Sequence, residues 1–203
     1  MHSKRHFFDE MAEVWDKRAN ASRLRSLLQE ELPRFCLASG ERVLDVGCGT
    51  GNLTAALVSL VGVRGRVAAV DLSPGMIRRA RLKVPEPRVV WAECDAMAAP
   101  FDRESFDRVF CYSVWPHFED SKALSEELWR VLRVGGRLHI WHSISRAAVN
   151  EIHRSSGPAI HRDHLPPAAE VEALLRRTGF RIESGRDDDT GFLVTGCKER
   201  ADR

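Results

Sequence analysis

The sequence predicts an α/β protein with a doubly wound, mostly parallel sheet and an antiparallel terminal hairpin. Short β-rich runs alternate with longer amphipathic runs along most of the chain, which is typical of a parallel sheet with helices on both faces. A glycine-rich turn joins the first of these runs to the helix behind it. The last two β-rich runs have no helix between them, so they must pair antiparallel.

Five strands are expected before that hairpin, and each is short, as suits a buried central sheet. They cover residues 42–46, 66–71, 89–93, 106–112 and 137–143. The hairpin runs cover 180–184 and 191–197 and are joined by the polar turn 187–190. Five strands and a hairpin make a sheet of seven strands.

Helices are predicted between these strands by apolar spacing and by capping residues. Residues 52–60 follow the glycine turn, and Ser73 and Pro74 supply an N-cap and a first-turn proline for the next helix. Residues 121–132 form an apolar stripe that the glycines at 135 and 136 should end, and residues 168–178 are closed by Gly179. Between them, 144–167 is a polar, proline-containing stretch.

The N-terminal segment has helical spacing of apolar residues over 7–15 and 24–32, which predicts two helices. These helices could simply pack on the sheet. The first could instead form a flap over a site, because it is aromatic and is attached by the polar sequence 17–22.

Composition bounds the class of protein. The 203 residues carry 31 Lys+Arg against 29 Asp+Glu, and 43% are hydrophobic, so one folded domain without a nucleic-acid footprint is expected. The apolar stretch 53–63 is too short for a membrane span, and the first ten residues are charged where a secretory signal is apolar. Five scattered cysteines without a C-x-x-C pair suit the cytoplasm and suggest no thiolate metal site.

The loop 43–52 (VLDVGCGTGN) is the most informative part of the sequence. Gly47, Gly49 and Gly51 stand where a strand turns into a helix, which lets a ligand approach the backbone N–H groups. The lysine of a phosphate-binding P-loop is missing. A dinucleotide fingerprint would place its third glycine at 52, where the chain has Asn52.

Three acids follow consecutive strands at the edge where open α/β sheets bind ligands. Asp45 lies two residues before the first glycine, Asp71 ends the second strand and Asp95 follows the third. An acid at the end of the second strand is placed to accept both hydroxyls of a ribose. The loop and the acids therefore make one constellation.

In this constellation the sequence resembles the class I S-adenosylmethionine-dependent methyltransferases. The resemblance rests on 44–51 (LDVGCGTG), 70–76 (VDLSPGM), 94–96 (CDA), 106–110 (FDRVF) and 132–138 (LRVGGRL), and covers roughly residues 40 to 143. The terminal hairpin fits the reversed last strand of that family's seven-stranded sheet. Within the family, the aromatic N-terminus and the motif at 70–73 are loosely similar to the quinone-biosynthesis type.

The resemblance implies S-adenosylmethionine as cofactor and assigns roles to the motif residues. The glycine loop would pack on the amino acid and ribose, Asp71 would bind the ribose hydroxyls, Asp95 the adenine amino group, and Met76 the adenine face. Acids suit the sulfonium and ammonium charges of this cofactor better than they suit a pyrophosphate, and Asp45 is the residue that discriminates between the two ligands. The expected cofactor-binding residues are Asp45, Gly47, Gly49, Gly51, Asp71, Leu72, Met76, Asp95 and Ala96.

The segment after the fourth strand, 112–118 (YSVWPHF), is expected beside the methyl group. It lacks the Asn/Asp-Pro-Pro-aromatic motif of nucleic-acid amino methyltransferases, which favours a small-molecule acceptor. Five of the eight histidines fall between 139 and 164. They are solvated loop residues, groups that orient or deprotonate the acceptor, or metal ligands. We expect His117 and His142 to be the catalytic candidates and assign no metal ligand.

The expected function is methyl transfer to a small molecule by in-line displacement. The single domain 1–203 would comprise a helical flap (1–39), a cofactor-binding core (40–143), a substrate cap (144–167) and a terminal helix and hairpin (168–203). The alternatives are a non-catalytic cofactor-binding or regulatory protein and a methyltransferase for a metal, metalloid or corrinoid acceptor. A nicotinamide dehydrogenase is disfavoured by Asn52 and by the terminal hairpin.

Overall fold

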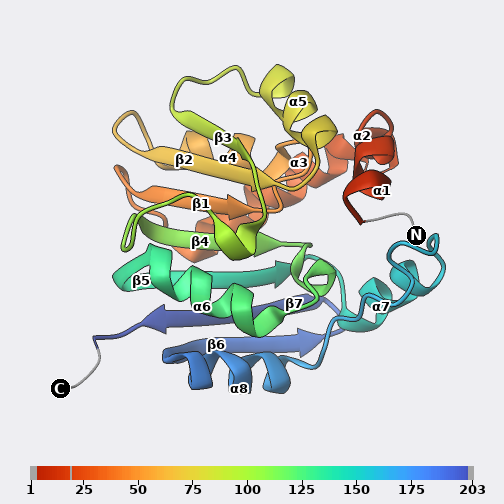
Figure 1. The fold of residues 1–203 in the computed structure, drawn as a ribbon. Helices are drawn as coiled ribbons and strands as arrows, with labels where there is room; N and C mark the ends of the chain where they lie inside the picture. The colour runs from red at the N-terminus through yellow and green to blue at the C-terminus, as the bar shows by residue number, and fades with distance from the viewer. Residues whose placement is uncertain (1–3, 19, 201–203) are drawn as a thin grey trace.

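The computed structural model describes residues 4–18 and 20–200, and in them seven strands form one sheet. The strand order is β3-β2-β1-β4-β5-β7-β6, in which β7 alone runs antiparallel to its neighbours (Figure 1). The strands are β1 (Arg42–Val46), β2 (Arg66–Asp71), β3 (Val89–Glu93), β4 (Phe106–Tyr112), β5 (Leu132–His142), β6 (Phe180–Asp188) and β7 (Gly191–Lys198). The predicted α/β fold class is therefore confirmed.

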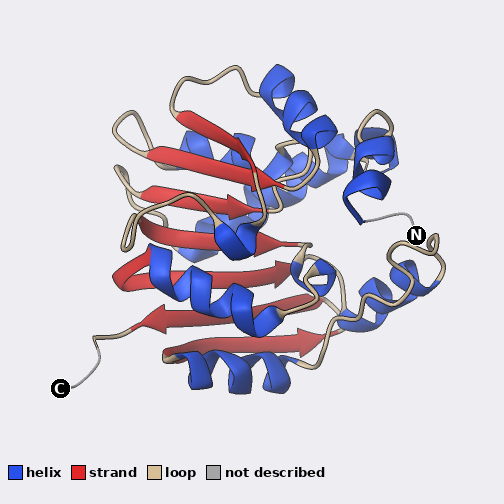
Figure 2. Ribbon diagram, viewed as in Figure 1, coloured by secondary structure: helices blue, strands red, loops and turns tan. Residues whose placement is uncertain are grey.

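Helices cover both faces of the sheet (Figure 2). One face packs on α3 (Ala21–Glu31), α4 (Asn52–Leu60) and α5 (Pro74–Lys83), and the other on α6 (Ser121–Val131) and α8 (Ala168–Thr178). Successive side chains of β1 point to opposite faces of the sheet. Val43 packs in the same cluster as Leu57 of α4, and Leu44 packs in the cluster that contains residues of α6 and α8. This double burial explains why the strands are short and apolar.

The carboxyl edge of the parallel strands carries the remaining elements. Figure 1 shows α1 (Lys4–Met11), α2 (Trp15–Arg18) and α7 (Arg146–Arg154) beyond the tips of β1, β4 and β5. Three short 3₁₀ turns complete the chain: η1 (Leu32–Phe35), η2 (Ala96–Ala98) and η3 (Trp115–His117). No helix among the described residues is long and apolar enough to cross a membrane.

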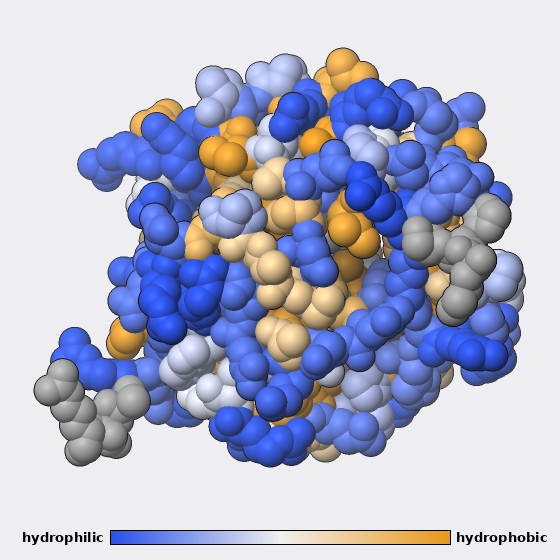
Figure 3. Space-filling model, viewed as in Figure 1, coloured by the Kyte–Doolittle hydropathy of each residue, from blue (hydrophilic) through white to orange (hydrophobic). Residues whose placement is uncertain are grey.

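The edge strand β3 is thinly covered on the α6 face, because only η2 follows it there. Figure 3 shows an apolar strip over this region. Val90 is exposed, and Ala92, Met97 and Phe101 are partly buried against the core below. The strip lies on a face of the sheet, away from the edge that carries the glycine loop.

Four predicted elements differ from the structure. The first N-terminal helix breaks between Met11 and Trp15 into α1 and α2. β5 begins at Leu132, because the glycine pair forms a bulge in the strand, with Gly135 at φ +80°, instead of a helix stop. β6 extends to Asp188, so the turn predicted over 187–190 is shortened to residues 189–190. The stretch predicted as irregular contains α7, whose N-cap Ser145 accepts a hydrogen bond from the Ala148 N–H.

Candidate active site

The glycine loop connects β1 to α4 with all three glycines in the left-handed region, at φ +67°, +53° and +82°. A Cβ on Gly47 would lie 2.2 Å from Val114, and one on Gly51 would lie 3.1 Å from Ala80. At Gly49 the one atom of the described residues within 4 Å of such a Cβ is the Trp15 indole nitrogen, at 3.8 Å. Two glycines therefore admit close packing of the protein on itself, whereas Gly49 faces the space beneath the N-terminal segment.

Gly47→Ala should destabilise the fold by about 2–4 kcal/mol, since left-handed strain and overpacking each cost about 1–3 kcal/mol. Chemical denaturation measures the loss. In a double-mutant cycle with Val114→Ala, the added methyl should cost less than in the Val114 background. Equal stability of Gly47→Ala and wild type would contradict the close contact.

Asp71 ends β2 and holds the loop in place. Its Oδ2 accepts a hydrogen bond from the Gly49 N–H at 2.9 Å, and its Oδ1 accepts one from the Ser73 N–H at 2.9 Å. Burial raises the pKa of Asp71, although these backbone hydrogen bonds oppose the rise. A carboxylate offers about four lone pairs, so about two remain for further donors.

Asp45 lies deeper, between β1 and the first turn of α4. It is 1% exposed, and its Oδ2 accepts a hydrogen bond from the Thr54 hydroxyl at 2.6 Å. Burial raises the pKa of Asp45 to about 7, with the Thr54 hydrogen bond opposing and the negative charge of Asp71 adding to the rise. The site therefore contains a carboxyl whose ionisation responds to nearby charge at neutral pH.

The other predicted cofactor residues divide by exposure. Leu72 and Asp95 are exposed at the ends of the paired strands β2 and β3, where Asp95 caps η2 by accepting a hydrogen bond from the Met97 N–H at 2.9 Å. Met76 and Ala96 are buried, at 1% and 6% exposure. Leu72 and Asp95 are thus reachable from solvent in this structure, and Met76 is not.

The segment α1–α2 lies against the glycine loop and the start of α5. The Asp16 carboxylate accepts a hydrogen bond from the Thr50 hydroxyl at 2.6 Å and pairs with Lys83 at 2.7 Å. Asp9 accepts a hydrogen bond from the Gly75 N–H at 2.6 Å. The first predicted N-terminal helix is thus fastened to the loops at the carboxyl edge, whereas Leu28 of α3 packs in the core. Sequence spacing did not reveal these polar contacts.

A polar cluster joins η3 to α1 and to the segment after α7. The Nδ1 atom of His117 lies 2.7 Å from Oδ2 of Asp163, and the other Asp163 oxygen pairs with Lys4 at 2.8 Å. The Nδ1–H of His153 donates a hydrogen bond to the Asp163 backbone oxygen at 3.0 Å. The His117 ring also packs edge-on against Phe8, 5.0 Å between centroids. Asp163, His153 and Lys4 were not predicted as site residues.

His142 borders this cluster but is buried, with 2% exposure and no hydrogen-bond partner for Nε2. Its pKa is lowered to about 3, chiefly by burial and also by the nearby His117 and His153. His139, three positions earlier in β5, lies on the opposite face of the sheet, where it packs against Phe35. The clustered histidines thus separate by location, and no group of three potential metal ligands occurs in the described part of the chain.

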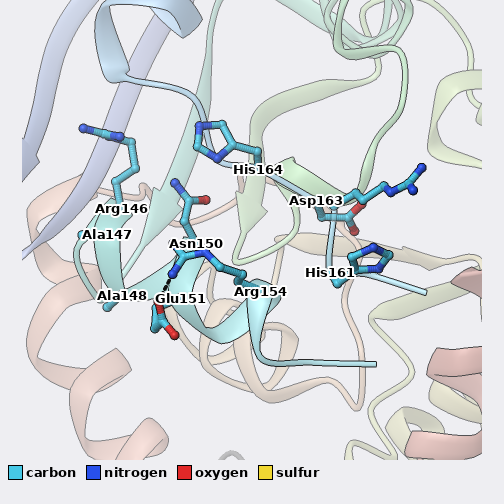
Figure 4. Close-up of a pocket in the computed structure, with 10 residues that line it drawn as sticks. Arg146, Ala147, Ala148, Asn150, Glu151, Arg154, His161, Asp163 and His164 are labelled. Carbon is cyan, nitrogen blue, oxygen red and sulfur yellow. Dashed lines mark hydrogen bonds and ion pairs between the residues drawn. The ribbon is translucent and has the colours of Figure 1, made fainter. Parts of the chain in front are cut away.

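Beside α7 there is an open hollow of about 670 Å³ (Figure 4). Arg146, Arg154, His161 and His164 line it together with Asp163. Arg154 pairs with Glu151 of the same helix. The Asn150 side-chain amide donates a hydrogen bond to the Leu165 backbone oxygen and accepts one from the Leu165 N–H. Two of the clustered histidines therefore line a surface hollow on α7.

Comparison with known proteins agrees with this geometry. A family model described as a methyltransferase domain matches residues 44–140. The chain is 32% identical over 167 residues to the aklanonic acid methyltransferase DauC of Streptomyces sp. (strain C5), covering 78% of this chain and 74% of that protein. It is 38% identical over 136 residues to a demethylmenaquinone methyltransferase of Roseiflexus castenholzii (67% and 53% covered).

Solved structures share the fold. A putative methyltransferase from a complex with the Haloferax volcanii Trm112 activator has a TM-score of 0.81 at 21% identity, with 95% of this chain and 98% of that chain covered. A SAM-dependent methyltransferase from Aquifex aeolicus has a TM-score of 0.69 at 24% identity, with 87% and 97% covered. The chain belongs to the class I S-adenosylmethionine-dependent methyltransferases. It spans about half the length of the first curated relatives it matches, between 44% and 58%.

Proposed function

We propose that this chain binds S-adenosylmethionine at the glycine loop and transfers its methyl group to a small-molecule acceptor in the cytoplasm. One observation carries the proposal: the Asp71 carboxylate at the end of β2 holds the glycine loop and still has lone pairs available beside exposed Leu72. Five free cysteines support the cytoplasmic setting. The balanced charge gives no support for a nucleic-acid substrate.

The residues at this edge fit the chemistry of the cofactor. A ribose supplies two hydroxyl donors for the remaining lone pairs of Asp71. The neighbouring acids Asp45 and Asp71 favour the ammonium and sulfonium charges of the cofactor. Leu72 and Asp95 are exposed at the same edge of the sheet, where they could contact its adenine. When bound, the cofactor supplies an electrophilic methyl group. The chain's own task is to orient the acceptor and exclude water.

We assign the acceptor side of the site to the N-terminal segment 1–39 and to residues 144–167, as a flap and a cap. The contacts of Asp9 and Asp16 with the loops, and of Lys4 with Asp163, support this division. By their names, relatives act on 2-phytyl-1,4-naphthoquinone, on demethylmenaquinone and on aklanonic acid. An assay for S-adenosylhomocysteine formation over a panel of small acceptors tests the proposal. Cofactor binding without turnover of any acceptor would favour the non-catalytic alternative.

Cofactor binding should release part of a proton near neutral pH. The pKa of Asp45 is about 7 in the free protein, and a cation beside the carboxyl lowers it. The carboxyl is therefore partly protonated at pH 6.5, and binding favours its ionised form. Affinity should rise between about pH 6 and 7.5, because ligands that favour a deprotonated state bind more tightly as pH rises.

Calorimetry in two buffers of different ionisation enthalpy measures this release, with Asp45→Asn as the control that removes Asp45's share. Identical binding enthalpies in both buffers for the wild-type protein would show that no carboxyl at this site changes its protonation.

A further inference from the structure

We infer that Asp163 is a positioning residue that makes His117 a general base, and that the acceptor is therefore a phenol or enol methylated after loss of its hydroxyl proton. The inference rests on the proposed function. It adds a residue that the sequence did not assign to the site, and it names a chemical class of acceptor.

The first step is the proton on His117. Burial acts to raise the pKa of Asp163, but the hydrogen bonds from His117 and Lys4 outweigh it and lower the pKa. Asp163 is then a carboxylate and can only accept, so the atom 2.7 Å away, Nδ1 of His117, must carry the hydrogen. A neutral imidazole has one N–H, which leaves Nε2 as an acceptor.

The second step is rigidity. The Asp163 side chain is 7% exposed and is held from three elements: His117 of η3, Lys4 of α1, and His153 of α7 through its backbone oxygen. His117 and Lys4 each hold one carboxylate oxygen, and His153 holds the backbone, so rotation of the carboxylate away from the imidazole would break the contact with Lys4 as well. This is the arrangement of a base with a third group orienting it.

The third step is access. Nε2 of His117 has no hydrogen-bond partner in the described residues, yet it is absent from the buried unpaired atoms, so solvent reaches it. His117 follows β4 at the edge that carries Asp71, and a positive charge on its ring, once it has taken up a proton, lowers the pKa of that carboxyl. Nε2 is therefore a free acceptor on the cofactor side of the sheet.

His142 does not compete for this role. A pKa of about 3 makes its imidazole a weak proton acceptor at neutral pH, and its side chain is sealed from solvent. The titratable groups around His117 are Lys4 of α1, Asp71 of β2, His142 of β5, His153 of α7 and Asp163.

The reaction balances with these groups. The acceptor hydroxyl gives its proton to Nε2 of His117, and the resulting anion forms a bond to the methyl carbon from oxygen or from the conjugated ring carbon. The carbon–sulfur bond breaks, and its electron pair remains on sulfur. The imidazolium stays paired with Asp163 until it loses its proton to solvent. After attack through carbon, the ring proton also leaves and the oxygen takes a proton back, so either route releases one proton in total.

The acceptor class follows from the need for this base. A neutral hydroxyl becomes a strong nucleophile only after deprotonation, so a base at this position suits a hydroxyl acceptor. The Phe8 ring, whose centroid lies 5.0 Å from that of His117, places an aromatic side chain beside the base, which suits a ring-shaped acceptor. A phenol or enol satisfies both features.

Asp163→Asn should lower kcat by about 10²- to 10⁴-fold, the range for loss of a positioned base. The cofactor Kd and the acceptor KM should stay within about threefold, and Asp163→Glu should recover part of kcat. Glu172→Gln is the matched control, because it makes the same carboxylate-to-amide change and breaks the Glu172–Arg176 ion pair on α8, outside the segments assigned to the site. Its kcat should equal that of wild type.

Nuclear magnetic resonance supplies a readout besides activity. In ¹⁵N-labelled wild-type protein, His117 should show a protonated Nδ1 and an unprotonated Nε2, with its signals identified by their loss in His117→Gln. Asp163→Ala should remove this tautomer preference. An Nε2-protonated His117 in wild type would overturn the inference.

A series of ring-substituted phenols gives the sharpest activity test. The wild-type to Asp163→Asn ratio should be largest for weakly acidic phenols and should approach one for phenols already ionised in the assay. A ratio independent of phenol acidity, or turnover of amines or thiols but of no phenol, would overturn the inference while leaving methyl transfer intact. Failure of wild type to bind the cofactor, or to turn over any acceptor, would instead count against the proposed function.

Discussion

Asp71→Ala should weaken S-adenosylmethionine binding by at least about 100-fold. Two charge-assisted hydrogen bonds to the ribose, at about 1.5–3 kcal/mol each, correspond to a loss of about 3 kcal/mol or more. The side chain also holds the Gly49 and Ser73 N–H groups, so its loss disturbs the loop as well. Calorimetry with the purified variant measures the change.

Asp95→Ala provides the matched comparison, because Asp95 is an exposed carboxylate at the end of the neighbouring strand. Its effect should be smaller, since an exposed side chain contributes less than a buried one. Circular dichroism and denaturation should show that both variants fold. An unchanged dissociation constant in a folded Asp71→Ala protein would remove this residue from the site.

Gly49→Val should abolish detectable cofactor binding. The residue lies at φ +53°, and within residues 4–18 and 20–200 the one atom within 4 Å of an added Cβ is the Trp15 nitrogen, at 3.8 Å. A β-branched side chain would strain the backbone and would fill the space between the loop and the N-terminal segment. Calorimetry should show no heat of binding at cofactor concentrations that saturate wild type.

Gly135→Val is the control that separates backbone strain from obstruction of the cofactor site. Gly135 also has a positive φ, +80°, but has open space around it and lies in the bulge of β5. It should lose stability through strain, by about 1–3 kcal/mol, and still bind the cofactor normally. If Gly49→Val bound as tightly as wild type, the glycine loop would be only a structural turn.

The sequence predicted the parts of this fold that depend on local pattern. β1 to β4, α4, α8 and the Ser73 cap lie at the predicted residues, because apolar runs, glycine turns and capping residues act over a few positions. The edge of the sheet that carries Asp71 followed from strand polarity. These features located the glycine loop and its acids.

The parts that the sequence did not predict depend on contacts between distant residues. His117 and Asp163 are separated by 46 positions, and Lys4 and Asp163 by more than 150. A polar pair of this kind leaves no periodic signal. Asp163 stands between His161 and His164 in the predicted cap, but nothing in the sequence assigned it a role, and the structure turns its carboxylate toward His117.

The structure also separates the two histidines that the sequence treated alike. Both follow neighbouring strand ends, yet η3 leaves Nε2 of His117 reachable while the layer above β5 seals His142. Burial sets which imidazole can accept a proton near neutral pH, and burial depends on the packing of α7 and Phe192, which sequence alternation does not define.

A crystal structure of the protein with S-adenosylhomocysteine tests the central claim most directly. The account predicts the product between the glycine loop and α1–α2, with both ribose hydroxyls donating to the Asp71 carboxylate and the sulfur atom on the side of His117. A product bound elsewhere, or a ribose beyond hydrogen-bond distance of Asp71, would contradict it.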